Sequence, residues 1–155
     1  MVNENSLQAE ALEKFTDVFL EIPFNRMLGL RLESYEDGEI TIRFLMKEEL
    51  IGNYLHGILH GGVISSVLDM AGGAAAMVSV VQKTSFTNIA ELAGIIGKSS
   101  TIDLHVSYIR PGKGSEFVAK ARIMHTGNKI SFAQMELYND QSILIASGTG
   151  TYLIG

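Results

Sequence analysis

A long apolar segment that carries a single acid constrains the fold of this chain most strongly. Residues 61–81 are dominated by Gly, Ala, Val and Met, and Asp69 is their only charged residue. A lone acid near the centre of a bilayer costs roughly 2.5–3.5 kcal/mol, which disfavours a membrane span. We therefore predict a helix from about His60 to Val81 that is buried in a protein core.

The remaining segments show the periodicities of two further helices and six strands. An N-terminal helix is expected within residues 1–22, because apolar side chains recur on one face until Pro23 ends it. Segment 82–98 is interpreted as an insertion with one short helix between Asn88 and Gly97. Strands are expected at 28–32, 40–46, 99–110, 115–126, 129–138 and 142–154, the last four as a meander with turns at 111–114, 127–128 and 139–140.

These elements predict one α+β domain that covers residues 1–155. One face of an antiparallel sheet has to be covered, and the long helix is the obvious cover. Because this helix is apolar on all sides, we expect a sheet of about six strands to curve around it.

Composition argues against several functional classes. The formal net charge is −5 and no basic block occurs, which argues against nucleic acid or an anionic membrane as the main partner. The chain has no cysteine, so neither a disulfide nor a thiol nucleophile is available. Its polar N-terminus lacks the apolar core of a secretory signal. We expect a cytoplasmic protein.

Two features of the long helix suggest chemistry, and each has a structural alternative. Gly61 and Gly62 at its start would present unpaired N–H groups that can form an oxyanion hole, although a tight helix entry also needs small residues. Asp69 in an apolar setting would be an effective general base, because desolvation favours the protonated form of a carboxylate. The alternative is an acid that caps a neighbouring loop or pairs with a buried base.

The histidines give a weaker indication. His56 and His60 have the i, i+4 spacing of zinc-binding helices, but the Glu of the H-E-x-x-H motif is missing and Gly57 lies between them. We expect neither a metal nor another cofactor.

The segment HGGVISSVLDMAGG, from His60 to Gly73, resembles the signature of the hotdog-fold acyl-CoA thioesterases, which include phenylacetyl-CoA and 4-hydroxybenzoyl-CoA thioesterases. Residues 100–114 resemble the strand that follows in this family, with its D-x-x-x-x-Y-x-R-P ending, and GNKI resembles its glycine-plus-base turn. The insertion at 82–98 is similar to that of a bacterial subgroup of medium- and long-chain acyl-CoA thioesterases. The resemblance implies a hotdog fold and hydrolysis of acyl-CoA.

The resemblance also implies roles for individual residues. Asp69 would be the general base or nucleophile, the Gly61 amide would polarise the thioester carbonyl, and His60 would position the substrate. Thr101 falls where the family often has a Ser or Thr that helps to hold the water. The family has an Asn six residues before the His, where this chain has Tyr54; a one-residue bulge would bring Asn53 into that place.

Further residues are expected to contact the substrate. Gly62 belongs to the glycine pair beside the thioester. Arg110, Lys113 and Lys129 lie near predicted turns and are candidates for the phosphates of CoA, the alternative being ordinary surface charge.

Helix geometry indicates that the site is shared between two copies of the chain. Eight helical residues place Asp69 about 12 Å along the axis from Gly61, whereas an attacking water must lie within about 3–3.5 Å of the carbonyl carbon. Two antiparallel helices related by a twofold axis would bring Gly61 of one copy beside Asp69 of the other. We therefore expect a homodimer or a homotetramer.

Two other functions stay open. A hotdog hydratase or dehydratase would work through a His–acid pair, but the proline-bearing loop that follows its His is absent. A non-catalytic acyl-CoA-binding regulator would carry a DNA-binding domain, for which a single acidic domain of 155 residues leaves no room.

Overall fold

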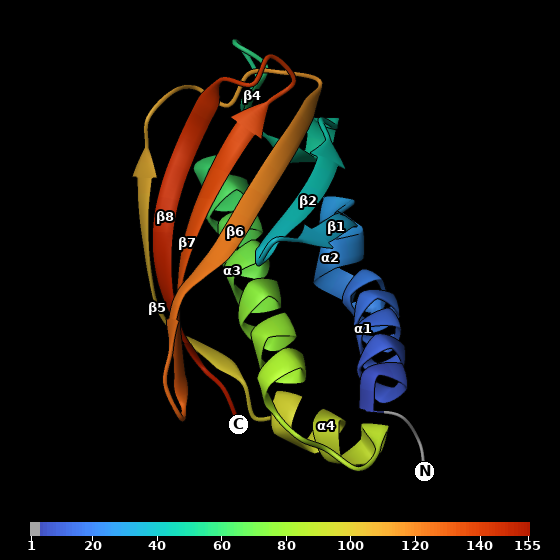
Figure 1. Cartoon of the computed structure of the whole chain (residues 1–155). Coiled ribbons are helices and arrows are strands. Elements are labelled where there is room, and N and C mark those ends of the chain that lie inside the picture. Colours follow the sequence, from blue (N-terminus) through green and yellow to red (C-terminus); the bar gives the residue numbers. More distant parts are fainter. Residues whose placement is uncertain (1–3) are drawn as a thin grey trace.

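The computed structural model describes residues 4–155, and a long helix packed against one face of a sheet dominates it (Figure 1). The helices are α1 (Glu4–Glu21), α2 (Pro23–Leu28), α3 (Gly61–Lys83) and α4 (Ile89–Ile96), with one 3-10 turn, η1 (Glu48–Leu50). The strands are β1 (Arg31–Glu36), β2 (Glu39–Leu45), β3 (Ile51–Asn53), β4 (Ile58–Leu59), β5 (Ser100–Tyr108), β6 (Glu116–Thr126), β7 (Ile130–Asn139) and β8 (Leu144–Leu153). The predicted α+β class, with a long helix, a six-stranded sheet and an N-terminal helix, is confirmed.

The strand order of the main sheet corrects the predicted meander. Its order is β1-β2-β6-β7-β8-β5, and every neighbouring pair is antiparallel. Strands β6, β7 and β8 do form a meander, but β5 pairs with β8 and lies at the edge. Segment 109–115 is therefore a connection past two strands and not a hairpin turn. Loop length alone did not reveal this, because a short Pro-Gly segment suits both arrangements.

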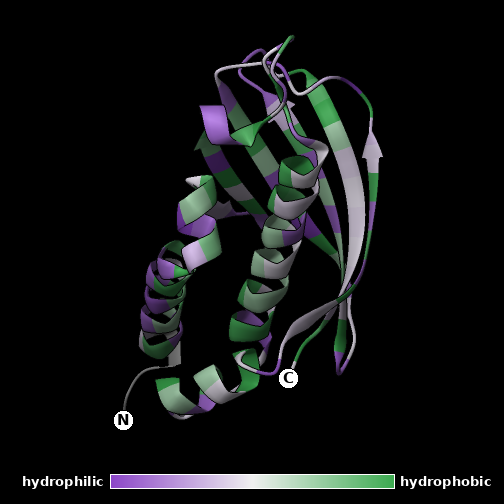
Figure 2. Ribbon diagram, turned by 180° about the vertical axis from the view of Figure 1, so that it is seen from behind, coloured by the Kyte–Doolittle hydropathy of each residue, from purple (hydrophilic) through white to green (hydrophobic). Residues whose placement is uncertain are grey.

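The core lies between α3 and the concave face of the sheet. Strand β2 alternates strictly, and its inward side chains Ile40, Ile42 and Phe44 are fully buried. Phe44 stacks on Phe117 of β6 with ring centroids 5.2 Å apart. Figure 2 shows the apolar character of α3, whereas the outer side of α1 is polar. Of the most apolar window of α3, 67% is buried inside the protein, so this helix is long and apolar enough for a membrane but serves as the core helix.

Two local elements differ from the sequence prediction. Pro23 ends the first helix as expected, but it also occupies the first turn of a second helix, α2, where its missing N–H costs nothing. Gly29 closes α2 with a left-handed conformation, φ 74°, so the first strand begins at Arg31 and not at Leu28. A small second sheet, β3-β4, precedes α3 and was not predicted.

The adjacent glycines of α3 have opposite surroundings, which predicts opposite effects on stability. A Cβ at Gly72 would lie 2.2 Å from the Tyr152 hydroxyl and 2.9 Å from Met135 Sδ, whereas a Cβ at Gly73 would meet Tyr152 only at 3.7 Å. Gly72→Ala should lower the free energy of unfolding by about 1–3 kcal/mol through overpacking. Gly73→Ala should raise it by up to about 1 kcal/mol through helix propensity. Urea unfolding of the two variants beside the wild type tests this, and equal effects would contradict it.

Candidate active site

The start of α3 presents one free amide. His60 is the N-cap, with extended backbone, and its Nδ1 accepts a hydrogen bond from the Gly62 N–H at 2.8 Å. This bond needs the lone pair on Nδ1, so the neutral ring carries its proton on Nε2. It also occupies the Gly62 N–H. Within residues 4–155 no acceptor contacts the Gly61 N–H, so the dipole-aligned amide of Gly61 is available to an oxyanion.

Gly61 is tied to the end of the edge strand. The Tyr108 hydroxyl, at the end of β5, donates to the Gly61 carbonyl at 3.1 Å. A cavity of about 320 Å³ adjoins this contact, and Gly61, Tyr108 and Arg110 all line it. The structure thus brings together two residues predicted for different tasks, the oxyanion amide and a base for CoA.

Asp69 forms the second half of the site with the other end of β5. Thr101 Oγ1 donates to Asp69 Oδ1 at 3.0 Å, and the Tyr152 hydroxyl of β8 donates to the Asp69 carbonyl at 3.3 Å. Burial, followed by the negative charge of Asp69, raises the pKa of Tyr152 far above its ordinary value, so this hydroxyl stays a donor. Thr101 therefore holds the carboxylate through one oxygen and leaves the other oxygen for a water.

The predicted burial of Asp69 was wrong for the single chain. Its side chain is half-buried, because its neighbour β5 is the edge strand and leaves this side of α3 open. The apolar sequence around Asp69 reflects the opposite side of α3, where Val67, Leu68 and Ala71 are fully buried against the sheet. The acid faces the one side of the helix that the fold leaves uncovered.

A bulge in β5 allows both of its ends to face α3. Residues 100–101 and residues 103–108 pair with β8 in registers that differ by one, so Ile102 is the extra residue. In a regular strand, the spacing of seven residues between Thr101 and Tyr108 would put their side chains on opposite faces of the sheet. Because the bulge takes up one residue, both side chains face α3, and Thr101 reaches Asp69 while Tyr108 reaches Gly61.

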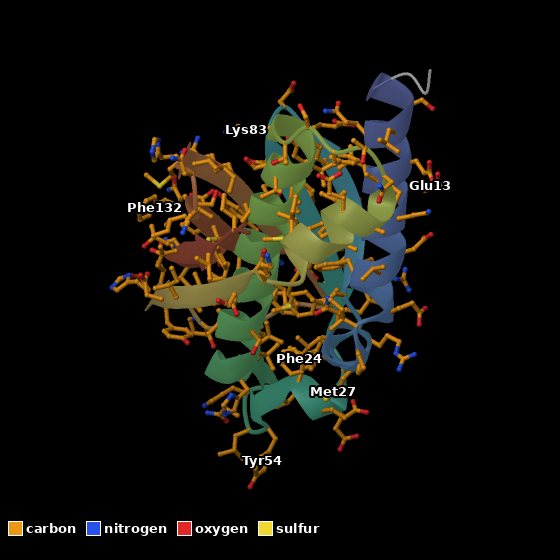
Figure 3. The ribbon with its side chains drawn as sticks, turned by 90° about the horizontal axis from the view of Figure 1, so that it is seen from below. Glu13, Phe24, Met27, Tyr54, Lys83 and Phe132 are labelled. Atoms are coloured by element: carbon orange, nitrogen blue, oxygen red, sulfur yellow. The ribbon has the colours of Figure 1, made fainter. Side chains whose placement is uncertain are left out.

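The other predicted site residues are scattered. Asn53 ends β3 just after a register shift in the β3–β4 pair, yet its side chain accepts from the Leu55 N–H at 3.2 Å and contacts neither Asp69 nor Gly61. The adjoining Tyr54 points into solvent at the tip of this hairpin (Figure 3), and it is 85% exposed. Asn53 stays a prediction.

The predicted CoA-binding bases lie at two ends of the sheet. Arg110 donates to the Leu144 carbonyl at 3.0 Å and lines the same cavity as Gly61, and Lys113 is exposed in the loop that follows. The Lys113 carbonyl is held by Asn139 at 2.9 Å, which fixes this loop on the β7–β8 turn. Lys129 lies in the β6–β7 turn, at the same end of the sheet as the start of β5, with the end of β8 between them. Within one chain Lys129 is therefore at the opposite end of β5 from the other two.

A metal role for the histidines gains no support from the described part of the chain. Across residues 4–155 the structure contains no group of three or more His, Cys, Asp or Glu side chains that could hold an ion. His56 lies on the exposed β3–β4 turn, and the Nδ1 of His60 is engaged by Gly62.

Comparison with known proteins assigns the family. The profile described as "Thioesterase superfamily" matches residues 56–146, well over half of the chain, and includes both halves of the site. The chain belongs to the thioesterase superfamily. This thioesterase-superfamily protein is similar to YigI of Salmonella typhimurium, named a medium/long-chain acyl-CoA thioesterase, with 40% identity over 147 residues, 94% of this chain and 95% of that one.

Two further relatives also match almost the whole length of this chain. YigI of Escherichia coli, with the same descriptive name, is 39% identical over 147 residues, 94% of this chain and 95% of that one. A crystal structure of a Shewanella oneidensis protein related to the thioesterase superfamily is 41% identical and superimposes with a TM-score of 0.90, covering 96% of this chain and 97% of that chain. The hotdog fold implied by the sequence resemblance is thereby confirmed.

Three residues of the site were missed by sequence reasoning. Tyr108 was noted only as part of a motif, and Tyr152 only as a strand residue. Gly52 was not considered, although a Cβ there would lie 2.5 Å from the His60 Cα, so only glycine lets β3 pass this close to the helix cap. Each of the three acts through tertiary contacts that have no local sequence signal.

Proposed function

We propose that this protein hydrolyses medium- to long-chain acyl-CoA to the free acid and CoA, at sites shared between two copies of the chain. The observation that carries the proposal is the division of the machinery between the two ends of β5. A free amide adjoins Tyr108 at one end, and a carboxylate held by Thr101 adjoins the other. The two relatives that are named medium/long-chain acyl-CoA thioesterases support the substrate class.

The exposed edge of β5 supports a dimer that would join these two halves. This strand is nine residues long and largely exposed, and Ile102 and Tyr108 are large apolar side chains that are 52% and 55% exposed. A long bare edge of this kind invites pairing with another strand. Two β5 strands could pair in antiparallel fashion about a twofold axis at His105. Because the bulged Ile102 stays unpaired, Thr101 would then lie opposite the partner's Tyr108. Asp69 would then face the partner's Gly61, and a tetramer would be built from such dimers.

The chemistry follows from this arrangement. The thioester carbonyl accepts a hydrogen bond from the partner's Gly61 N–H, which stabilises the negative charge that develops on its oxygen. Asp69 takes a proton from a water, and the oxygen of that water bonds to the carbonyl carbon. When the tetrahedral intermediate collapses, the carbon–sulfur bond breaks and CoA leaves as a thiolate that takes up a proton. In the alternative route an Asp69 oxygen bonds to the carbonyl carbon, the carbon–sulfur bond breaks and the CoA thiolate leaves; water then hydrolyses the resulting mixed anhydride to the free acid and the Asp69 carboxylate.

The remaining predicted residues have places in this proposal. The partner's Arg110 and the partner's Lys113 lie on the side where CoA leaves the partner's Gly61, whereas Lys129 of the first chain approaches from the other end. These bases would supply local positive charge in a protein whose net charge is −5. His60 fixes the helix start through Gly62, and this bond would keep the Gly61 amide aligned for the substrate. A cytoplasmic location stays a prediction.

Release of free thiol from acyl-CoA tests the function directly. The purified protein should release CoA thiol from acyl-CoA, detected with a chromogenic disulfide, and kcat/KM should rise from butanoyl- to decanoyl-CoA. A hydratase would leave the thioester intact and change the enoyl absorbance instead. A binding protein would retain acyl-CoA without turnover. Absence of thiol release at any chain length would refute the proposal.

A further inference from the structure

We propose that the acyl tail lies in an apolar cavity between α1 and α3, and that the missing side chain of Gly73 keeps this cavity open. The cavity, called the tail cavity below, is bounded by residues 15–22 in and just after α1, residues 70–77 of α3, Ile96 of α4 and residues 99–101 at the start of β5. Its volume is about 280 Å³, near the lower end of about 300–1,000 Å³ that is usual for small-molecule sites. The inference rests on the proposed thioesterase function and adds where the tail binds.

The cavity arises from a mismatch between two facing helix stripes. On α1 and the residue that follows it, the lining residues are spaced i, i+3, i+4, i+7, and they are Phe15, Val18, Phe19 and Ile22. On α3 the same spacing gives Met70, Gly73, Ala74 and Met77. Both stripes are apolar, so the helices pack together, but the two small residues in the middle of the α3 stripe leave space beneath the aromatic rings of α1. Figure 2 shows α1 and α3 side by side, with α4 lying across the gap between their lower ends.

One end of the tail cavity adjoins the reacting centre. Thr101 lines the cavity and also donates to Asp69 at 3.0 Å, and Tyr152 lines it and donates to the Asp69 carbonyl. A thioester held beside Asp69 therefore has its acyl carbons at the mouth of an apolar space. Ile22, which lines this space, is 39% exposed, so a bound tail would cover carbon that is now in contact with water.

The far end of the tail cavity lies along α3. Helix α1 runs antiparallel to α3 (Figure 1), and Gln8 contacts the Gln82 carbonyl near their common end. Counting back from this contact places Phe15 beside Ala74 and Met77. Met77 is eight residues beyond Asp69, about 12 Å along the axis. An extended chain of single bonds advances about 1.2 Å per bond, so the distance from Asp69 to Met77 accommodates about ten carbons.

Gly73 lies halfway along this path. It is one helical turn beyond Asp69, about 6 Å along the axis, so a side chain there would stop the tail after about five carbons. The helix itself has room for such a side chain, because the nearest atom to an added Cβ is 3.7 Å away. The packing of α3 against Tyr152 requires a glycine at Gly72, but it does not require one at Gly73. The open space at Gly73 is therefore explained by the tail.

The test compares one blocking, one enlarging and one control variant of the full-length protein. Gly73→Leu fills the middle of the tail cavity, and Phe15→Ala removes its far wall. Gly94→Leu is the matched control, since it makes the same change on the exposed face of α4, where an added Cβ meets no atom within 4 Å. The readout is kcat/KM for even-numbered acyl-CoA from butanoyl to hexadecanoyl, with circular dichroism to verify folding.

Gly73→Leu should lower the ratio of decanoyl- to butanoyl-CoA kcat/KM on the order of 10²–10³-fold, because each of about five methylenes loses roughly three- to fourfold. Phe15→Ala should move the optimum to longer tails, and Gly94→Leu should keep the wild-type profile. If the Gly73→Leu variant does not fold, Gly73→Ala should shift the ratio in the same direction by a smaller factor. A wild-type profile in the folded Gly73 variants, or an equal change in Gly94→Leu, would overturn the inference.

A binding measurement separates this inference from the proposed function. Decyl-CoA, a thioether that cannot be hydrolysed, is titrated calorimetrically into the wild type and Gly73→Leu. Weaker binding by the variant supports the tail cavity even if the wild type hydrolyses nothing, in which case the thioesterase proposal alone fails. Equal binding together with normal hydrolysis refutes the tail cavity and leaves the thioesterase proposal standing.

Discussion

Asp69→Asn should lower the kcat for acyl-CoA hydrolysis on the order of 10²–10⁴-fold and leave the fold and the oligomer unchanged. The amide has nearly the same shape as the carboxylate, and its oxygen can still accept the hydrogen bond from Thr101, which spans 3.0 Å in the wild type. It cannot take a proton from water, because an amide oxygen is a very weak base. The loss should therefore fall on kcat and leave KM little changed, since Asp69 acts in the transition state and not in substrate binding.

The control is an acid-to-amide change on another helix. Asp17 is exposed on α1 and does not line the tail cavity, so Asp17→Asn should behave as the wild type. Thiol release measured across substrate concentrations gives kcat and KM for both variants. If Asp69→Asn keeps its activity to within a few-fold, the carboxylate is structural and the proposed mechanism is wrong.

Mixing two inactive variants should restore roughly a quarter of the wild-type activity, if each site takes Gly61 from one chain and Asp69 from the other. Gly61→Pro removes the oxyanion N–H, and Asp69→Asn removes the base, so each homodimer should be nearly inactive. Co-refolding in equal amounts makes about half of the dimers mixed, and each mixed dimer has one site with both lesions and one site intact. If both groups came from the same chain, every site would carry one lesion and mixing would restore nothing.

The backbone around Gly61 is suited to this substitution. Gly61 is the first residue of α3, a position at which proline is favoured, and His60 before it has ψ 137°, as a residue before proline requires. A Cβ at Gly61 would lie 3.4 Å from the Tyr108 ring, which is ordinary contact. Gly61→Ala is the matched control, because it adds the Cβ and keeps the N–H, so it should stay active. Mixed dimers that form by native mass spectrometry without regaining activity would exclude the shared site.

The sequence was informative wherever a local pattern decides the structure. The long apolar run from Gly61 predicted α3, and the spacing of Asn88 and Glu91 predicted the start of α4, where the Asn88 side chain does accept from the Glu91 N–H. The pattern HGG followed by an acid also indicated the chemistry before any geometry was known. These features need only neighbours along the chain, so periodicity and capping rules reach them.

Features that depend on distant segments were beyond the sequence. The pairing of β5 with β8 is a choice between strands of similar composition, and nothing near residue 109 indicates that the chain crosses to β6. The contact of Tyr108 with the Gly61 carbonyl joins residues that are 47 positions apart. The exposure of Asp69 follows from the position of β5 at the edge, so it could not be predicted before the strand order was known.

The bulge in β5 gives this strand room to lose one residue over evolutionary time. Thr101 and Tyr108 are seven residues apart, whereas their partners on β8, Tyr152 and Ala146, are six apart, so Ile102 is the residue that has no match on β8. Loss of Ile102 would leave Thr101 and Tyr108 six apart in a regular strand, and both side chains would still face α3. Loss of a second residue would turn one of the two side chains away from α3, so a single deletion marks the limit for this strand.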